Sequence, residues 1–183
     1  MPYEDVGACP FEGCVYREWR ANAVVAVRTT RLASAAIAFR VRKGEAVTAL
    51  TGIVVTTVPG RVRFRAPADL TWTDFETAVL GRVPSRRPRE SGVLHVEPGD
   101  TLYLLTYHGE GSTAAWFNGR LYEELDGATA FFNAACADDP SRCAGRIIEK
   151  PQRIWWVQVQ NALGQRGWTA EPEKFDGKDA LAR

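Results

Sequence analysis

The sequence is poor in the residues on which many active sites and all membrane-spanning helices depend. It contains two histidines and one methionine in 183 residues. Its longest apolar stretches, such as 33–39, are far shorter than the roughly 20 residues that cross a bilayer, so we expect no membrane span. Lysine and arginine total 23, and aspartate and glutamate total 22. This balance removes the positive field of a general nucleic-acid binder, so no nucleic-acid partner is expected.

The overall composition is that of an ordinary globular protein. Hydrophobic residues make up 45% and charged residues 25%, which excludes wholesale disorder and allows one ample core or two small ones. The first residues, Met1–Asp5, lack the basic and apolar regions of a signal peptide. Because Met1 is the only methionine, we interpret it as a start codon placed before a mature domain whose export signal was removed. A cytosolic protein is the alternative, and the cysteines bear on this choice.

Four cysteines form two close pairs along the sequence, Cys9 with Cys14 and Cys136 with Cys143. Each pair brackets a proline-containing turn, which favours local disulfides, and each short loop would contribute roughly 2 kcal/mol. Links between the clusters would contribute about 5 kcal/mol, and the sequence alone leaves three pairings open. A four-thiolate zinc site fits the wide second spacing poorly, and free thiols are the remaining alternative. Local disulfides indicate an oxidising compartment, so we expect a periplasmic or secreted protein without a metal or cofactor.

Short β-rich runs separated by turns predict an all-β fold. In the first half of the chain, strands are expected over 23–28, 36–41, 46–55 and 61–65. The pattern then weakens. The segment 74–80 predicts one or two helical turns, and 82–89, with its arginines and prolines, predicts a mobile basic loop. A solvated loop is favoured there over an anion-docking loop because no aromatic residue interleaves the charges.

The second half of the chain returns to the strand pattern. Strands are expected over 101–107, 115–117, 120–123, 154–159 and 167–169. The Asn118-Gly119 pair between two aromatic-bearing runs predicts a tight hairpin and is the strongest local signal in the chain. A short helix is expected around 128–135, and a charged tail from Glu171 onward is expected on the surface.

Two stretches resemble parts of bacterial SH3-like domains. The segment 24–50, with Val-Arg-Lys-Gly-Glu-Ala-Val at 41–47, is similar to their opening strands. Trp-Trp-Val-Gln-Val at 155–159, followed by Gly164 and Gly-Trp-Thr at 167–169, is similar to their closing hairpin. The segment 98–123 has a similar pattern, with Gly-Asp before a strand and a glycine-rich bend after it. The whole chain, from 8–14 to 174–180, also resembles a family of uncharacterised exported bacterial proteins. The first resemblance implies small barrels that bind cell-wall peptides, glycans or partner proteins, whereas the second implies no known activity.

The opening-like and closing-like stretches lie about a hundred residues apart, which is more than one small barrel needs. We therefore expect two SH3-like β units, either in tandem or with one inserted in the other. The tandem division places an N-terminal disulfide segment at 1–20, a first unit at 21–95, a second unit at 96–170 and a C-terminal tail at 171–183.

The sequence offers no convincing catalytic constellation. His95 and His108 belong to different strand signals, and Ser91 and Ser112 lack the flanking glycines of a nucleophile elbow. No phosphate loop, dinucleotide fingerprint or haem motif is present. Carboxylates are plentiful, but a glycosidase holds two of them a few ångströms apart across a sugar, and linear spacing indicates no such pair. We assign no catalytic residues and expect lone surface histidines rather than a metal site.

The aromatic residues are the better guide to function. If 154–159 is extended, Trp155 and Trp156 point to opposite faces, so that one ring faces a core and the other faces solvent, a neighbouring unit or a ligand. Packing is the more frequent role of a tryptophan, and a groove for sugar rings or peptide side chains is the alternative. The candidate ligand-binding residues are Tyr16, Trp19, Tyr107, Trp116, Trp155 and Trp156.

These patterns together favour a non-enzymatic SH3-like binding module of the bacterial cell envelope. Its expected ligand is a cell-wall peptide or glycan, or a protein partner. A small envelope hydrolase that uses paired carboxylates and a structural or assembly protein are the alternatives. The sequence assigns no oligomeric state.

Overall fold

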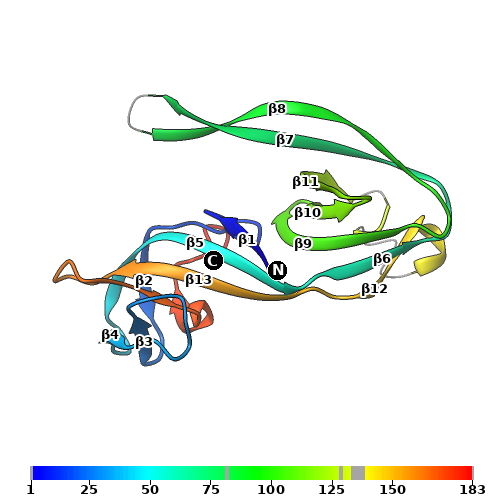
Figure 1. Cartoon of the computed structure of the whole chain (residues 1–183). Coiled ribbons are helices and arrows are strands. Elements are labelled where there is room, and N and C mark those ends of the chain that lie inside the picture. Colours follow the sequence, from blue (N-terminus) through cyan, green and yellow to red (C-terminus); the bar gives the residue numbers. More distant parts are fainter. Residues whose placement is uncertain (1, 81–82, 128–129, 133–138, 183) are drawn as a thin grey trace. The chain divides into compact units, whose positions relative to one another are not determined.

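The chain folds into β-strands arranged in two sheets (Figure 1). The computed structural model describes residues 2–80, 83–127, 130–132 and 139–182. Within this part of the chain, two short 3-10 helices, Pro140–Arg142 and Pro172–Lys174, accompany the strands, and no helix is long and apolar enough to cross a membrane. The all-β class expected from the sequence is confirmed.

The contacts divide the chain into two compact units that are nested in the sequence. Unit 1 combines Met1–Thr57 with Arg153–Arg183, and unit 2 is the continuous segment Val58–Gln152. Of the two arrangements expected, the contacts follow insertion rather than the tandem boundaries 21–95 and 96–170. The physical reason is that the C-terminal strands pair within the sheet of the N-terminal strands, so the first sheet is completed only by the end of the chain.

The sheet of unit 1 contains strands from both of its segments. Their order in the sheet is β15-β2-β5-β13-β14-β3-β4, and β1 pairs with β5. The strands are β1 (Tyr3–Val6), β2 (Glu18–Ala21), β3 (Val25–Arg28), β4 (Ile37–Val41), β5 (Ala46–Val58), β13 (Gln152–Gln160), β14 (Arg166–Thr169) and β15 (Phe175–Asp176).

The core of unit 1 is formed by alternating valines and large aromatic rings. The segment from Glu171 lies on the surface as expected, except for Phe175, and it is ordered into a 3-10 helix and β15, which pairs with β2. Phe175 is fully buried there, and its ring centroid lies 5.9 Å from that of Trp19. Burial of the Phe175 side chain contributes about 2 kcal/mol, which holds this charged segment against the core of unit 1.

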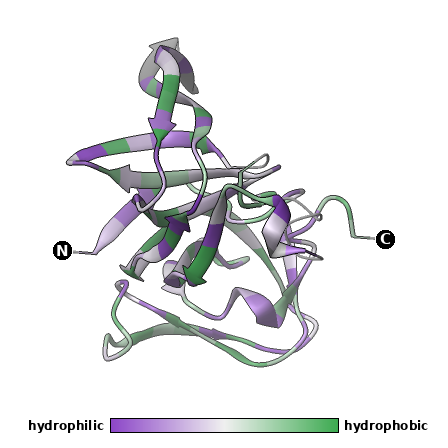
Figure 2. Ribbon diagram, turned by 90° about the vertical axis from the view of Figure 1, so that its right-hand side faces the viewer, coloured by the Kyte–Doolittle hydropathy of each residue, from purple (hydrophilic) through white to green (hydrophobic). Residues whose placement is uncertain are grey.

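The sheet of unit 2 has the order β12-β6-β9-β10-β11-β7-β8. Along many strands hydrophilic and hydrophobic residues alternate, as expected where one face covers a core (Figure 2). The turn at Asn118 and Gly119, with φ angles of 46° and 83°, joins β10 to β11 and confirms the predicted hairpin. The strands are β6 (Gly60–Phe64), β7 (Ala68–Leu80), β8 (Val83–Val96), β9 (Thr101–Gly109), β10 (Ser112–Phe117), β11 (Arg120–Asp126) and β12 (Gly145–Glu149).

Strands β7 and β8 form a long hairpin whose distal part is a two-stranded arm (Figure 1). Their pairing runs from Ala68–Val96 to Leu80–Val83, whereas β7 pairs with β11 at Trp72 and Thr73. The helical turns expected at 74–80 are therefore wrong, as is the basic loop in the described part of 82–89. β8 is an edge strand, which tolerates prolines because one of its sides has no ladder to complete. The expected helix around 128–135 falls mostly outside the described residues.

Candidate functional site

A disulfide joins Cys9 and Cys14, whose Cα atoms are 5.6 Å apart. This confirms the first of the two expected local pairs. The second depends on Cys136, which lies outside the described residues. In the described part of the chain, no group of three or more His, Cys, Asp or Glu residues is arranged to hold a metal ion. His95 is exposed and its Nδ1 lies 2.6 Å from Oδ1 of Asp69.

Three of the predicted ligand-binding residues pack together in unit 1, where Trp19 is buried in the core and Tyr16 and Trp155 are half-buried against it. Trp19 is 0% exposed, and its ring stacks on Tyr16 and meets Trp155 edge-on. The Trp155 Nε1–H donates a hydrogen bond of 3.2 Å to the Tyr16 hydroxyl, which itself donates to the carbonyl of Ala8. Burial raises the pKa of Tyr16 to about 12. These hydrogen bonds and ring contacts join the three side chains to one another, so they stabilise the fold of unit 1.

Trp155 and Trp156 do lie on an extended strand, β13, and so point to opposite faces. Trp156 is only 7% exposed and contributes to the lining of an open groove of about 550 Å³. The groove is also lined by Arg31, Leu32 and Ile154. Arg31 donates a hydrogen bond of 2.9 Å to Glu4. The groove therefore combines an apolar wall with one ion pair.

The two remaining predicted residues lie in unit 2 and differ in exposure. The ring of Tyr107 packs edge-on against Phe132 at 5.5 Å, and its hydroxyl accepts a hydrogen bond from the Gly111 N–H. Tyr107 is therefore a packing residue. Trp116 is 44% exposed. Its neighbours in β10, Ala115 and Phe117, are buried in the core, so alternation turns the Trp116 side chain to the outer face of the sheet.

Trp116 belongs to a row of side chains that crosses the outer face of the unit 2 sheet. Directly opposite it on β9 is Tyr103, which is 41% exposed. Opposed residues of antiparallel strands have Cβ atoms roughly 5 Å apart. Cross-strand partners extend this row to the neighbouring strands on both sides, and we call the whole row the aromatic row. In strand order its members are Glu149, Arg61, Tyr103, Trp116 and Leu121.

Tyr103 was missed by the sequence reasoning, although a signal was present. In β9 the apolar Leu102 and Leu104 flank it and are buried in the core. Period-two alternation through these leucines turns Tyr103 outward, whereas we had selected Tyr107 from the same strand. The row thus places two large exposed aromatic side chains on adjacent strands, where together they form one apolar patch.

One end of the aromatic row is charged, and a further charged residue lies beside it. Arg61 Nε lies 2.6 Å from Oε2 of Glu149. Two residues further along β6 is Arg63, which donates to the Thr101 hydroxyl at 3.2 Å and is directly opposite Arg146 of β12. The row therefore combines flat apolar rings with guanidinium donors and a carboxylate acceptor.

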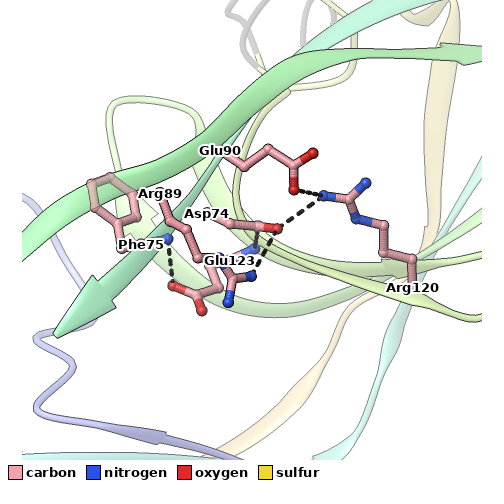
Figure 3. A network of polar contacts seen from close by, with 6 residues as sticks. All are labelled: Asp74, Phe75, Arg89, Glu90, Arg120 and Glu123. Atoms are coloured by element: carbon pink, nitrogen blue, oxygen red, sulfur yellow. Dashed lines mark hydrogen bonds and ion pairs between the residues drawn. The ribbon is translucent and has the colours of Figure 1, made fainter.

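A second polar cluster lies where the arm meets β11 (Figure 3). Asp74 has a side chain only 5% exposed. Its carboxylate accepts a hydrogen bond of 3.0 Å from Nη2 of Arg120 and another of 3.0 Å from the backbone N–H of Glu123. Arg89 contributes a more distant charge, with Nη2 at 3.9 Å. This network ties the base of the arm to the sheet.

The same cluster brings together carboxylates that linear spacing did not connect. Glu90 lies 3.5 Å from the Arg120 guanidinium, and Glu123 accepts a hydrogen bond from the Phe75 N–H. The Arg120 guanidinium also lies 4.0 Å from the ring centroid of Trp72. Because main-chain donors and Arg120 already hold these carboxylates, the cluster is best explained as a structural clamp.

Comparisons with protein-family models, curated proteins and solved structures found no match to this chain.

Proposed function

We propose that this protein is a non-enzymatic SH3-like binding module of the bacterial cell envelope that recognises a cell-wall glycan on the aromatic row. The observation that carries the proposal is the direct opposition of Tyr103 and Trp116 on the outer face of the unit 2 sheet. The disulfide Cys9–Cys14 supports an oxidising, extracytoplasmic location. The glycan assignment follows from the chemistry of the row.

A sugar ring has flat apolar C–H faces and a rim of hydroxyl groups. Exposed aromatic rings on adjacent strands match the faces, and the neighbouring Arg61 and Glu149 match hydroxyl acceptors and donors. Sheet faces of small β-barrels are used for oligosaccharides in this way. The near-neutral charge of the whole chain disfavours nucleic acid, which also stacks on aromatic platforms.

The proposal is tested by retention on purified bacterial cell wall. We expect Trp116→Ala and Tyr103→Ala each to lower the affinity about tenfold, since the loss of one stacked ring costs on the order of 1.4 kcal/mol. Leu163→Ala is the matched control, because Leu163 is exposed at a turn of unit 1 and lies outside the row. Equal retention of all four proteins would contradict the proposal, provided that circular dichroism shows each to be folded.

A peptide bound in the Trp156 groove is the second candidate function. The observation in its favour is the apolar wall formed by Leu32, Ile154 and Trp156 beside the Arg31–Glu4 ion pair. A peptide carboxylate would compete with Glu4 for Arg31. Loss of wall binding on Ile154→Ala, with Trp116→Ala unaffected, would favour this candidate over the glycan.

A further inference from the structure

One register step beyond the aromatic row, two arginines oppose each other across β6 and β12. Arg63 and Arg146 are direct cross-strand partners, and both are exposed. Arg61 and Arg63 flank the buried Val62, so they point to the same outer face. Arg146 lies on that face as well, because directly opposed residues share a face.

The two neighbouring positions of this strand pair differ in one respect. Opposite Arg61 stands Glu149, and the two form an ion pair. Opposite Arg63 stands Arg146, and the contact of Arg63 is with the neutral hydroxyl of Thr101. Among the residues that the structure describes, neither Arg63 nor Arg146 has a carboxylate within ion-pair distance.

Like charges directly opposite each other destabilise an antiparallel pair. Such a violation of a local rule is characteristic of functional sites, where a ligand relieves it. Two guanidinium groups side by side present forked N–H donors that match the planar geometry of a carboxylate. The preceding register step shows this pairing within the chain, where Glu149 supplies the carboxylate.

The arginine pair and the aromatic rings are close enough to hold one ligand. Two residues along a strand correspond to roughly 6.6 Å, and adjacent strands are about 4.8 Å apart. The centre of the Arg63–Arg146 pair lies two residues along β6 from Arg61, about one and a half strands from Tyr103 and two and a half strands from Trp116. This separation is on the scale of a few linked sugars.

From this arrangement we propose that the ligand is an acidic glycan, with a carboxylate held between Arg63 and Arg146 while a neighbouring sugar ring stacks on Tyr103 and Trp116. This inference rests on the proposed function, because it names the class of glycan that the same row takes. It also assigns a role to Glu149, which lowers the positive charge available to the ligand by occupying Arg61.

The test compares polygalacturonate with the same polymer after full methyl esterification, which removes the charge and keeps the backbone. We expect the full chain to bind the acid form at least tenfold more tightly at low salt, with a smaller preference at high salt. Arg63→Gln and Arg146→Gln should each weaken binding of the acid form about fivefold and leave the ester unaffected. Glu149→Gln should strengthen binding of the acid form. Arg42→Gln, an exposed arginine of unit 1, is the charge-matched control.

The outcomes separate this inference from the proposed function. Equal affinity for acid and ester, with both weakened by Trp116→Ala, overturns the inference and leaves the glycan-binding proposal intact. Failure of the full chain to bind polygalacturonate overturns the inference. If the full chain also fails to be retained on cell wall, both the inference and the proposed function are overturned. Binding of dextran sulfate as tight as that of polygalacturonate, with the same dependence on Arg63 and Arg146, overturns the assignment of a carboxylate.

Discussion

Removing the Arg120 guanidinium should strongly destabilise unit 2, because it leaves the buried Asp74 carboxylate without its main counter-charge. Arg120→Met keeps an apolar stem over Trp72 but removes a charge-assisted hydrogen bond, which contributes about 2 kcal/mol, and a cation–π contact of about 1 kcal/mol. We therefore expect a loss of about 3 kcal/mol in the free energy of unfolding. This figure lies at the low end for a broken buried ion pair because Arg120 itself is 41% exposed.

The companion variant Asp74→Asn tests the cause of this loss. Its amide oxygen still accepts from the Glu123 N–H, and Arg120 becomes hydrated, so we expect about 1.5 kcal/mol. In the double variant no buried carboxylate is left unpaired, so the combined loss should be about 2 kcal/mol smaller than the sum of the single losses. Urea denaturation followed by fluorescence and circular dichroism measures all three values.

Arg20→Met is the control for this cycle, since Arg20 is well exposed and its contacts, with Glu18 at 3.9 Å and with the Gly44 carbonyl at 2.7 Å, lie at the surface. Its effect should stay within about 0.5 kcal/mol. Strict additivity of the Arg120 and Asp74 variants, or a loss below about 0.5 kcal/mol for Arg120→Met, would refute the proposed clamp.

Three further predictions concern unit 1. Burial raises the pKa of Tyr16 to about 12 in the folded state, against an ordinary 10.0. The contribution of Tyr16 to stability is therefore present below pH 10 and is lost between pH 10 and 12. Denaturation measured across this pH range checks the prediction, and Tyr16→Phe should abolish the fall in stability. Gly52→Ala should destabilise the fold by at least about 2 kcal/mol in urea denaturation, because the added Cβ would lie 2.5 Å from Trp155 Nε1. Reduction of Cys9–Cys14 should lower the thermal midpoint, corresponding to about 2 kcal/mol for so short a loop, and an unchanged midpoint would contradict this.

Most strands were predictable from the sequence because the local signal and the final environment agree. Val25 and Val27, for example, alternate inward from a β-branched run and are both fully buried. Asn118-Gly119 supplies two positive φ angles, which the tight hairpin needs. Where propensity, alternation and turn chemistry coincide, the strand forms as predicted.

The β7–β8 hairpin was not predictable because its alternation is interrupted by a polar residue in a core-facing position. Leu70 and Trp72 face the core, and Asp74 continues this face as a buried carboxylate. Its partner Arg120 lies 46 residues away, so no local pattern shows that the charge is satisfied. The prolines of β8 also indicate a loop rather than a strand. They are tolerated because β8 is an edge strand.

The candidate site was only partly predictable for a similar reason. Trp116 was selected from its sequence and is exposed, but its direct cross-strand neighbour, Tyr103, follows from strand register. The opposition of Arg63 and Arg146 likewise depends on β6 pairing with β12, which are 80 residues apart. Cross-sheet rows are set by tertiary pairing and have no signature in a single stretch of chain.

The insertion of unit 2 also fixes an order of events during synthesis. β13, which lies beside β5 in the sheet, emerges from the ribosome only after the segment Val58–Gln152 has been translated. At typical rates of translation this delay lasts about 5 to 20 s, during which β5 has an edge without its native neighbour. Unit 2 is contiguous in the sequence and can complete its sheet first. The sheet of unit 1, although it begins earlier in the chain, is completed only when its C-terminal strands have been synthesised.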